Sequence, residues 1–223
     1  MHFDLQPFLL TFQLALVVTV ILFIIGLPLA YWLAYSSNRF KYIVESLVSM
    51  PLVLPPTVIG FYLLVVFSPK NFLGHFLEHY LGLRVVFSFT GLVIGSVIFS
   101  LPFMVNPIKA GLQNFSAALI EASYCLGKSP WETLRRIILP NIRPALLTGI
   151  VMAFAHTIGE FGVVLMVGGN IPGETRLASI AIFNEVEALN YDTAGLYALV
   201  LVGVSFSILL VFYYLNRKIL KIF

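Results

Sequence analysis

Two titratable side chains, His156 and Glu160, stand inside a long apolar stretch of this 223-residue sequence. Their spacing of four residues places both on one face of a helix. An imidazole and a carboxylate on one face could hold a metal ion or move protons, but two residues alone are not a metal motif. We therefore expect His156 to be a packing residue. We expect Glu160 to have a structural role near the outer end of its helix, hydrogen-bonded to the backbone of the loop that follows.

The sequence contains no pattern typical of an enzyme or of a bound cofactor. A membrane haem usually needs paired histidines, and His156 is the one histidine of four that lies in an apolar run. An intramembrane protease would need a nucleophile with a base within reach, and no such motif is present. The single cysteine, Cys125, permits no internal disulfide and offers no metal cluster, so a packing role is expected. We expect no catalytic residue, no metal and no cofactor.

The composition indicates what surrounds these side chains. Hydrophobic residues make up 60% of the chain and charged residues 10%, whereas soluble domains are about 45–50% apolar and about 25% charged. The apolar residues form long runs, which makes lipid the solvent for most of the chain. The net charge of +3 is small, and the Lys and Arg residues lie in loops beside apolar runs, which does not favour nucleic-acid binding. We expect a single, all-α polytopic membrane domain.

About five apolar runs are long enough to cross a bilayer, for which about 20 residues are needed. These runs cover residues 8–35, 43–67, 85–110, 142–167 and 193–215. A polar loop is expected over 68–86. Residues 177–190 are short and carry Glu185 and Glu187, so we expect a re-entrant or surface helix there and no sixth crossing. The N-terminal segment lacks the basic region of a cleaved signal peptide, and the first run is expected to remain in the mature protein.

Prolines interrupt the second run, in the sequence MPLVLPPTVIG that begins at Met50. Closely spaced prolines remove backbone donors and break a regular helix. Irregular backbone at membrane depth is buried in protein or lines a cavity, so this break is either a pore lining or a kink needed for packing. Uncharged hydrogen-bond donors suit a weak, transient anion path. The candidate path residues are Pro55, Pro56, Thr57, Asn106 and Asn170.

The positive charges indicate the orientation of the chain. With five crossings, ten of the thirteen Lys and Arg residues fall on one side, and Lys70, Arg84 and Arg176 fall on the other. The ten are Arg39, Lys41, Lys109, Lys128, Arg135, Arg136, Arg143, Arg217, Lys218 and Lys221. Because basic loops stay in the cytoplasm, we expect residues 116–140 and the C-terminus to be cytoplasmic and the N-terminus to be outside.

Residues 116–140, SAALIEASYCLGKSPWETLRRIILP, form the longest polar interruption between two strongly apolar runs. The pattern predicts two short helices, the first capped by Ser116 and ended by a left-handed Gly127. The second is expected to begin with a capping box at Ser129 and to end at Pro140. Such helices can lie on lipid headgroups, but a carboxylate in the middle of the first helix, Glu121, fits a protein partner better.

The spacing of this stretch resembles the signature E-A-A-x-x-x-G-x(9)-I-x-L-P of ABC importer permeases. The matching residues are Glu121, Ala122, Ser123, Gly127, Ile137, Leu139 and Pro140, with Ser123 in place of the second alanine. In that family the signature forms a coupling helix that seats in a groove of an ATP-hydrolysing subunit. The resemblance implies the fold of type I ABC importer permeases, and it implies the same coupling role for these residues.

Two further segments, 50–64 and 158–176, look like the permeases of molybdate importers, and the likeness covers most of the chain. Permeases for sulfate have a similar segment around Glu160, so sulfate or another oxyanion is the alternative substrate. The resemblance implies a homodimer in a bacterial cytoplasmic membrane, with two ATPase subunits and a soluble oxyanion-binding protein outside the cell. Transport would proceed by alternating access, with ATP hydrolysed in the partner subunit. A stand-alone channel is a further alternative, although a channel would not need the 116–140 stretch.

Overall fold

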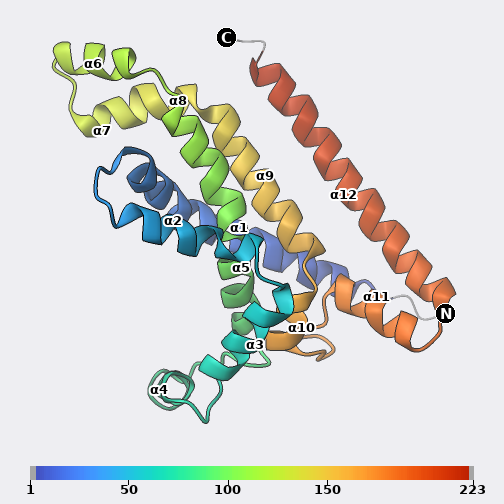
Figure 1. Cartoon of the computed structure of the whole chain (residues 1–223). Helices are drawn as coiled ribbons and strands as arrows, with labels where there is room; N and C mark the ends of the chain where they lie inside the picture. Colours follow the sequence, from blue (N-terminus) through green and yellow to red (C-terminus); the bar gives the residue numbers. More distant parts are fainter. Residues whose placement is uncertain (1–3, 221–223) are drawn as a thin grey trace.

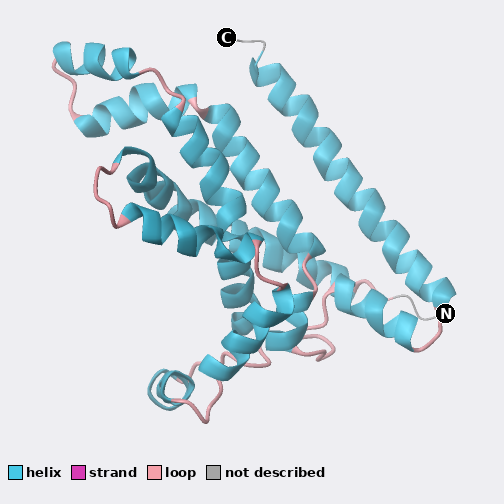
Figure 2. Ribbon diagram, viewed as in Figure 1, coloured by secondary structure: helices cyan, strands magenta, loops and turns pink. Residues whose placement is uncertain are grey.

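The computed structural model describes residues 4–220 and the side chains of residues 4–214. Within this range the regular structure is entirely helical (Figures 1 and 2). The elements are α1 (Gln6–Tyr35), α2 (Lys41–Ser49), η1 (Met50–Leu52), α3 (Pro56–Val66), α4 (Phe72–Leu81), α5 (Phe89–Gln113), α6 (Ala117–Cys125), α7 (Pro130–Thr133), η2 (Leu134–Ile138), α8 (Leu139–Asn141), α9 (Arg143–Gly159), α10 (Gly162–Gly168), α11 (Ala178–Glu187) and α12 (Tyr191–Leu220). The predicted all-α class is confirmed.

The core lies where α1, α5 and α9 pack together. Leu14 and Leu22 of α1 and Met104 and Ile108 of α5 are fully buried in one cluster. Gly149 lets α9 approach α5 closely, because a Cβ there would stand 2.9 Å from the carbonyl oxygen of Met104. Apolar burial of this kind fixes how α9 is placed, and α9 connects the two regions described below.

Three helices, α1, α5 and α12, are long and apolar enough to cross a membrane singly, and the number rises to five if two bent helix pairs are each one span. In α12 only 6% of the apolar window is buried inside the chain, against 56% in α5. Its exposed apolar side chains include Leu199, Val202 and Phe206. This helix stands at the edge of the molecule in Figure 1, with an apolar surface that lipid or another subunit can cover.

The proline-rich segment breaks the second run as its sequence predicts. α2 and η1 meet α3 at a bend of 111°. Pro55 is extended at the break, with ψ of 138°, and Pro56 begins α3. The bend turns α3 toward α10, against which it packs.

The fourth run, over the expected span 142–167, is not one continuous helix. α9 ends at Gly159, Glu160 is extended with ψ of 136°, and a separate short helix, α10, begins at Gly162. The break lets α10 pack against both α3 and α5, where Val163 and Val167 are buried. A straight helix could not have reached both neighbours.

Two shorter segments also form helices. The loop expected over 68–86 contains α4, because Phe72, Phe76 and Tyr80 recur at helical spacing and Gly82 ends the helix in a left-handed conformation. This part of the prediction was wrong. Within 177–190 the structure has α11, whose 10 residues extend about 15 Å, roughly half a bilayer.

The long helices place two groups of short helices at opposite ends of the molecule. Figure 1 shows α6, α7 and α8 at one end, together with the end of α12, whereas α4, α10 and α11 lie toward the other end. The side chains of Arg217 and Lys218, and all of Lys221, lie outside the described part of the chain.

Candidate functional site

The segment from Ser116 to Asn141, called the α6–α8 unit below, projects from one end of the molecule (Figure 1). Of the nine residues of α6, Ser123 is buried and Ile120 is half-buried, and the others are exposed. Large apolar side chains are among the exposed ones, with Leu126 80% exposed and Trp131 68% exposed. Exposed apolar side chains grouped on one protrusion are typical of a surface that binds another protein.

A glycine turn joins the two helices of this unit, as predicted. Gly127 has a φ of +74°, a conformation that side chains rarely adopt. Its N–H donates to the carbonyl of Tyr124 at 2.9 Å, and the N–H of Lys128 donates to the carbonyl of Ser123 at 3.1 Å. This pair of bonds is the Schellman arrangement that satisfies the last carbonyls of a helix.

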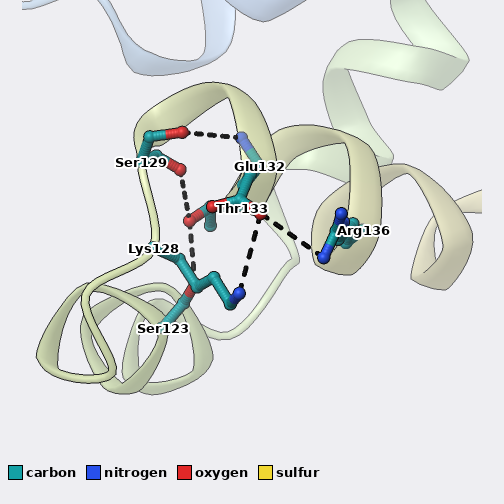
Figure 3. A network of polar contacts seen from close by, with 6 residues as sticks. All are labelled: Ser123, Lys128, Ser129, Glu132, Thr133 and Arg136. Carbon is teal, nitrogen blue, oxygen red and sulfur yellow. Dashed lines mark hydrogen bonds and ion pairs between the residues drawn. The ribbon is translucent and has the colours of Figure 1, made fainter.

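The capping signals are present in part. The hydroxyl of Ser129 accepts a hydrogen bond from the N–H of Glu132 at 3.2 Å. The Glu132 carboxylate does not return to Ser129, but lies 3.6 Å from Lys128 Nζ and 3.4 Å from Arg136 Nη1 (Figure 3). Ser116 precedes α6 without a side-chain capping bond, so its predicted capping role was wrong.

The second helix ends at Asn141, one residue after the Pro140 at which its end was expected. After α7 the chain forms a π-helical segment, η2, in which the N–H of Leu139 donates to the carbonyl of Leu134. A proline ring clashes with the carbonyl four residues earlier in an α-helix, and the wider π-turn moves that carbonyl away. The chain therefore continues through Pro140 to Asn141 and bends by 73° into α9.

The signature residues occupy two different environments in this unit. Glu121 and Ala122 are exposed on α6, whereas Ser123 is only 2% exposed. Ile137, Leu139 and Pro140 are half-buried, and Leu139 packs against the main core. The unit thus has an outward face that is open to a partner and an inner face that anchors it to the membrane helices.

A cavity of about 590 Å³ lies at the other end of α9. Its walls come from the start of α3 (Pro56 and Thr57), from Phe99 of α5 and from the end of α9, including His156 and Glu160. The breaks at Pro55 and Glu160 thus meet at one cavity. Thr57 is at the second position of α3, where backbone N–H groups have no partner inside the helix.

The two intramembrane titratable residues differ in their contacts. His156 Nδ1 is 3.0 Å from the hydroxyl of Ser100, and its ring stacks on Phe103 with centroids 3.9 Å apart. Both carboxylate oxygens of Glu160 are buried without a hydrogen-bond partner, so the bond expected from this side chain to the following loop is not formed. It is the backbone carbonyl of Glu160 that is bound, by the Ser179 hydroxyl at 2.7 Å.

The other path candidates lie away from this cavity. Asn106 is half-buried on α5, and the amide oxygen of Asn170 accepts a hydrogen bond from Arg176 Nε at 2.7 Å. Sequence reasoning also missed Thr133 and Ser100, both fully buried and hydrogen-bonded to side chains on other helices. Neither residue belongs to a local pattern that would have identified it.

The fold and the α6–α8 unit define a class of protein, a multi-pass helical membrane protein with a protruding helical unit at one end. The chain belongs to the family of binding-protein-dependent transport system inner membrane components, whose model matches residues 26–221. It is therefore a transport subunit, and the resemblance to ABC importer permeases is confirmed.

Individual relatives agree with this assignment. The chain is 43% identical to the molybdenum transport system permease protein ModB of Azotobacter vinelandii, over 96% of this chain and 95% of that protein. It is 36% identical to a probable sulfate transport system permease protein of Zygnema circumcarinatum, over 96% of this chain and 75% of the relative. The solved MetNI methionine ABC transporter, in an inward-facing conformation, superposes with a TM-score of 0.78 at 16% identity, over 97% and 96% of the two chains. The type I importer permease fold is thereby confirmed.

Proposed function

We propose that this chain is the membrane-spanning permease subunit of an ATP-driven importer for molybdate or the similar anion tungstate. The observation that carries the proposal is the identity of 43% to a molybdenum permease over nearly the whole of both chains. The substrate-binding specificity of such a system is expected to reside mainly in a separate binding protein, so the permease need only offer a weak path. Sulfate is the second candidate, because the sulfate permeases compared are 31–36% identical to this chain.

The α6–α8 unit is the proposed seat of the ATPase subunit. Its outer face presents Glu121 together with exposed Leu126 and Trp131, and a protein groove would cover them. A partner that bound this face equally in two states could not drive transport, because only a difference in contact shifts an equilibrium. The unit would be cytoplasmic and the N-terminus outside, since this places ten of the thirteen Lys and Arg residues on the cytoplasmic side.

Two copies of the chain are proposed to enclose one translocation path. The apolar groove along α2 and η1, of about 630 Å³, is lined by exposed Ile43, Leu47 and Met50. A second copy could bury such a surface. The candidate path is the cavity wall that contains Pro56 and Thr57, next to the break at Pro55, where the N–H of Thr57 at the start of α3 can meet an anion transiently. Asn106 and Asn170 remain weaker candidates.

The test is reconstitution of the permease in vesicles with its ATPase subunits and its binding protein. We expect ATP-dependent uptake of labelled molybdate that excess molybdate or tungstate abolishes and that equimolar sulfate leaves nearly unchanged. Stronger competition by sulfate would assign the sulfate function. Anion uptake by the isolated chain, without ATP or partners, would instead indicate a channel and would contradict the importer proposal.

The seat of the ATPase is tested separately with Glu121→Lys. Reversing a charge inside an interface is expected to weaken co-purification of the ATPase subunit by about tenfold or more. The matched control is Glu174→Lys, an equally exposed charge reversal in the loop between α10 and α11. Equal loss of the ATPase subunit in both variants would argue against the α6–α8 unit as its seat.

A further inference from the structure

α6 is held to the rest of the molecule by very few side chains. Ser123 is its one buried residue, and Ile120 is half-buried against the core. The other seven residues of α6 are exposed. A force applied to α6 by a bound partner therefore has few routes to the membrane helices, chiefly the chain ends of α6 and these two side chains.

Ser123 is fixed by two bonds, one from its backbone and one from its side chain. Its carbonyl accepts the N–H of Lys128 in the glycine turn, at 3.1 Å. Its hydroxyl lies 2.8 Å from the hydroxyl of Thr133, which is fully buried on α7 (Figure 3). Both partners lie in the second half of the unit, so Ser123 joins that half to α6.

The direction of the side-chain bond follows from counting protons. The Thr133 hydroxyl donates to the carbonyl of Ser129 at 3.0 Å. A hydroxyl has one proton, so Thr133 can only accept from Ser123. Removing the Thr133 hydroxyl would leave the buried Ser123 donor without a partner, whereas removing the Ser123 hydroxyl would leave Thr133 with its bond to Ser129. Loss of the Thr133 hydroxyl is therefore expected to be more disruptive than loss of the Ser123 hydroxyl.

Thr133 is also the residue directly before the run of helical segments, η2, α8 and α9, that leads to the cavity. The π-helical η2 begins at the next residue, α8 follows, and the chain bends into α9. The far end of α9 supplies His156 and Gly159 to the cavity wall. A displacement of α6 that is passed to Thr133 can thus move α9 along its length of about 26 Å.

We propose that Thr133 is a positioning residue for coupling, which clamps α6 to α7 through Ser123 and transmits the movement of α6 to α9. This role rests on the proposed function, because it assumes that the ATPase subunit moves α6. Thr133 is not part of the permease signature, and its partner Ser123 is the position at which this chain departs from that signature.

The clamp itself is tested on the isolated, full-length permease. Cys125 is exposed at the end of α6 and is the only cysteine of the chain, so a spin label attaches there without other changes. We expect the label to become more mobile in Thr133→Val and to keep its wild-type mobility in Thr133→Ser. Unchanged mobility in Thr133→Val would overturn the clamp, whatever the protein transports.

Coupling is tested in the reconstituted complex as uptake per ATP hydrolysed. The bond is lost in Thr133→Val and in Ser123→Ala, so both are expected to lower this ratio, by about three- to tenfold in Thr133→Val, which also orphans a buried donor, and by less in Ser123→Ala. The double variant, Ser123→Ala with Thr133→Val, lacks the same single bond and leaves no orphaned donor, so its loss should be smaller than the sum of the two single losses. Thr148→Val is the matched control, because that hydroxyl bonds only within its own helix, to Pro144 at 2.8 Å.

The outcomes separate this inference from the function on which it rests. A Thr133→Val ratio equal to that of Thr148→Val, or losses of Ser123→Ala and Thr133→Val that simply add in the double variant, would overturn the coupling role while the importer remained established. A wild-type complex without ATP-dependent uptake would overturn the proposed function and the coupling role together, and the spin-label result would still decide the clamp.

Discussion

The α6–α8 unit and the cavity at the far end of α9 are built from bonds of very different range. In the unit, the Schellman bonds and the Ser123–Thr133 bond join residues at most ten positions apart. At the cavity, the Ser100 hydroxyl bonds to His156 and Thr157, which are 56 and 57 positions away. The hydrogen bonds of the unit are therefore local in sequence, whereas those at the cavity form only when α5 and α9 are packed.

This difference suggests how the two regions share work. A locally bonded unit can keep its shape while it moves as one body, which suits contact with a partner that changes state. A cavity whose walls come from α3, α5 and α9 changes shape whenever these helices shift. Because α9 belongs to both, small rotations of the unit can alter the cavity without any change inside the unit itself.

The largest effect is expected from a substitution on α9, the helix that connects the α6–α8 unit to the cavity. In Gly149→Leu the new side chain would meet the Met104 carbonyl and Ile108 Cγ1, 2.9 Å and 3.2 Å from a Cβ. Forcing α9 away from α5 should cost about 3 kcal/mol or more, because overpacking against backbone cannot be relieved by a rotamer change. The measurement is the denaturant midpoint of the purified permease together with its yield in the membrane.

The control for this prediction is Gly203→Leu on α12, the same increase in size at a position with no heavy atom within 4 Å of a built Cβ. We expect a yield and a midpoint close to those of the wild type. Equal losses in the two variants would show that the packing of α5 on α9 does not dominate stability, and the proposed contrast between the regions would be wrong.

The range of the bonds also explains what the sequence could predict. Gly127, Ser129 and Pro130 are local signals, and the turn and the second helix start where these residues predict. The extension of that helix past Pro140 depends on the π-turn of η2, for which no residue type is diagnostic. No proline lies near the break at Glu160, since Pro144 stands at the other end of α9, and what favours the break is the packing of α10 against α3 and α5.

The cavity was predictable only in its parts. The prolines at 55 and 56 indicated irregular backbone, and His156 and Glu160 were visible as polar residues in an apolar run. That these segments meet is a result of tertiary packing, because they are about 100 positions apart in sequence, which no local pattern reports. The same limit applies to Asn106 and Asn170, which were selected for their chemistry and lie away from the cavity lining.

A smaller effect is expected at two glycines with left-handed backbone at opposite ends of the molecule. Comparing them separates the effect of backbone strain on stability from an effect on coupling. Gly127 and Gly82 have φ of +74° and +63°, and nothing lies within 4 Å of a built Cβ at either. Alanine at each position should cost about 1 kcal/mol through backbone strain alone. We expect similar falls in the unfolding midpoint, but a lower uptake per ATP hydrolysed only in Gly127→Ala. A similar loss of coupling in Gly82→Ala would mean that this ratio reports general stability and not the α6–α8 unit.

The smallest expected effect compares two carboxylates under the same substitution. Glu45 on α2 forms an ion pair with Lys109 of α5, and its side chain is 36% exposed, so Glu45→Gln should lower stability by about 0.5–1 kcal/mol. Glu160 is buried near the Ser96 hydroxyl, and neither of its carboxylate oxygens makes a hydrogen bond of normal geometry. Glu160→Gln keeps the shape and should leave the unfolding midpoint unchanged or raise it, with uptake within about twofold of wild type.

Opposite shifts of the midpoint in the two variants would confirm that Glu160 does not hold the break between α9 and α10 through its side chain. A folded Glu160→Gln permease without uptake would instead assign the carboxylate to the cavity's function, so the cavity would depend on a buried charge as well as on the packing of its helices.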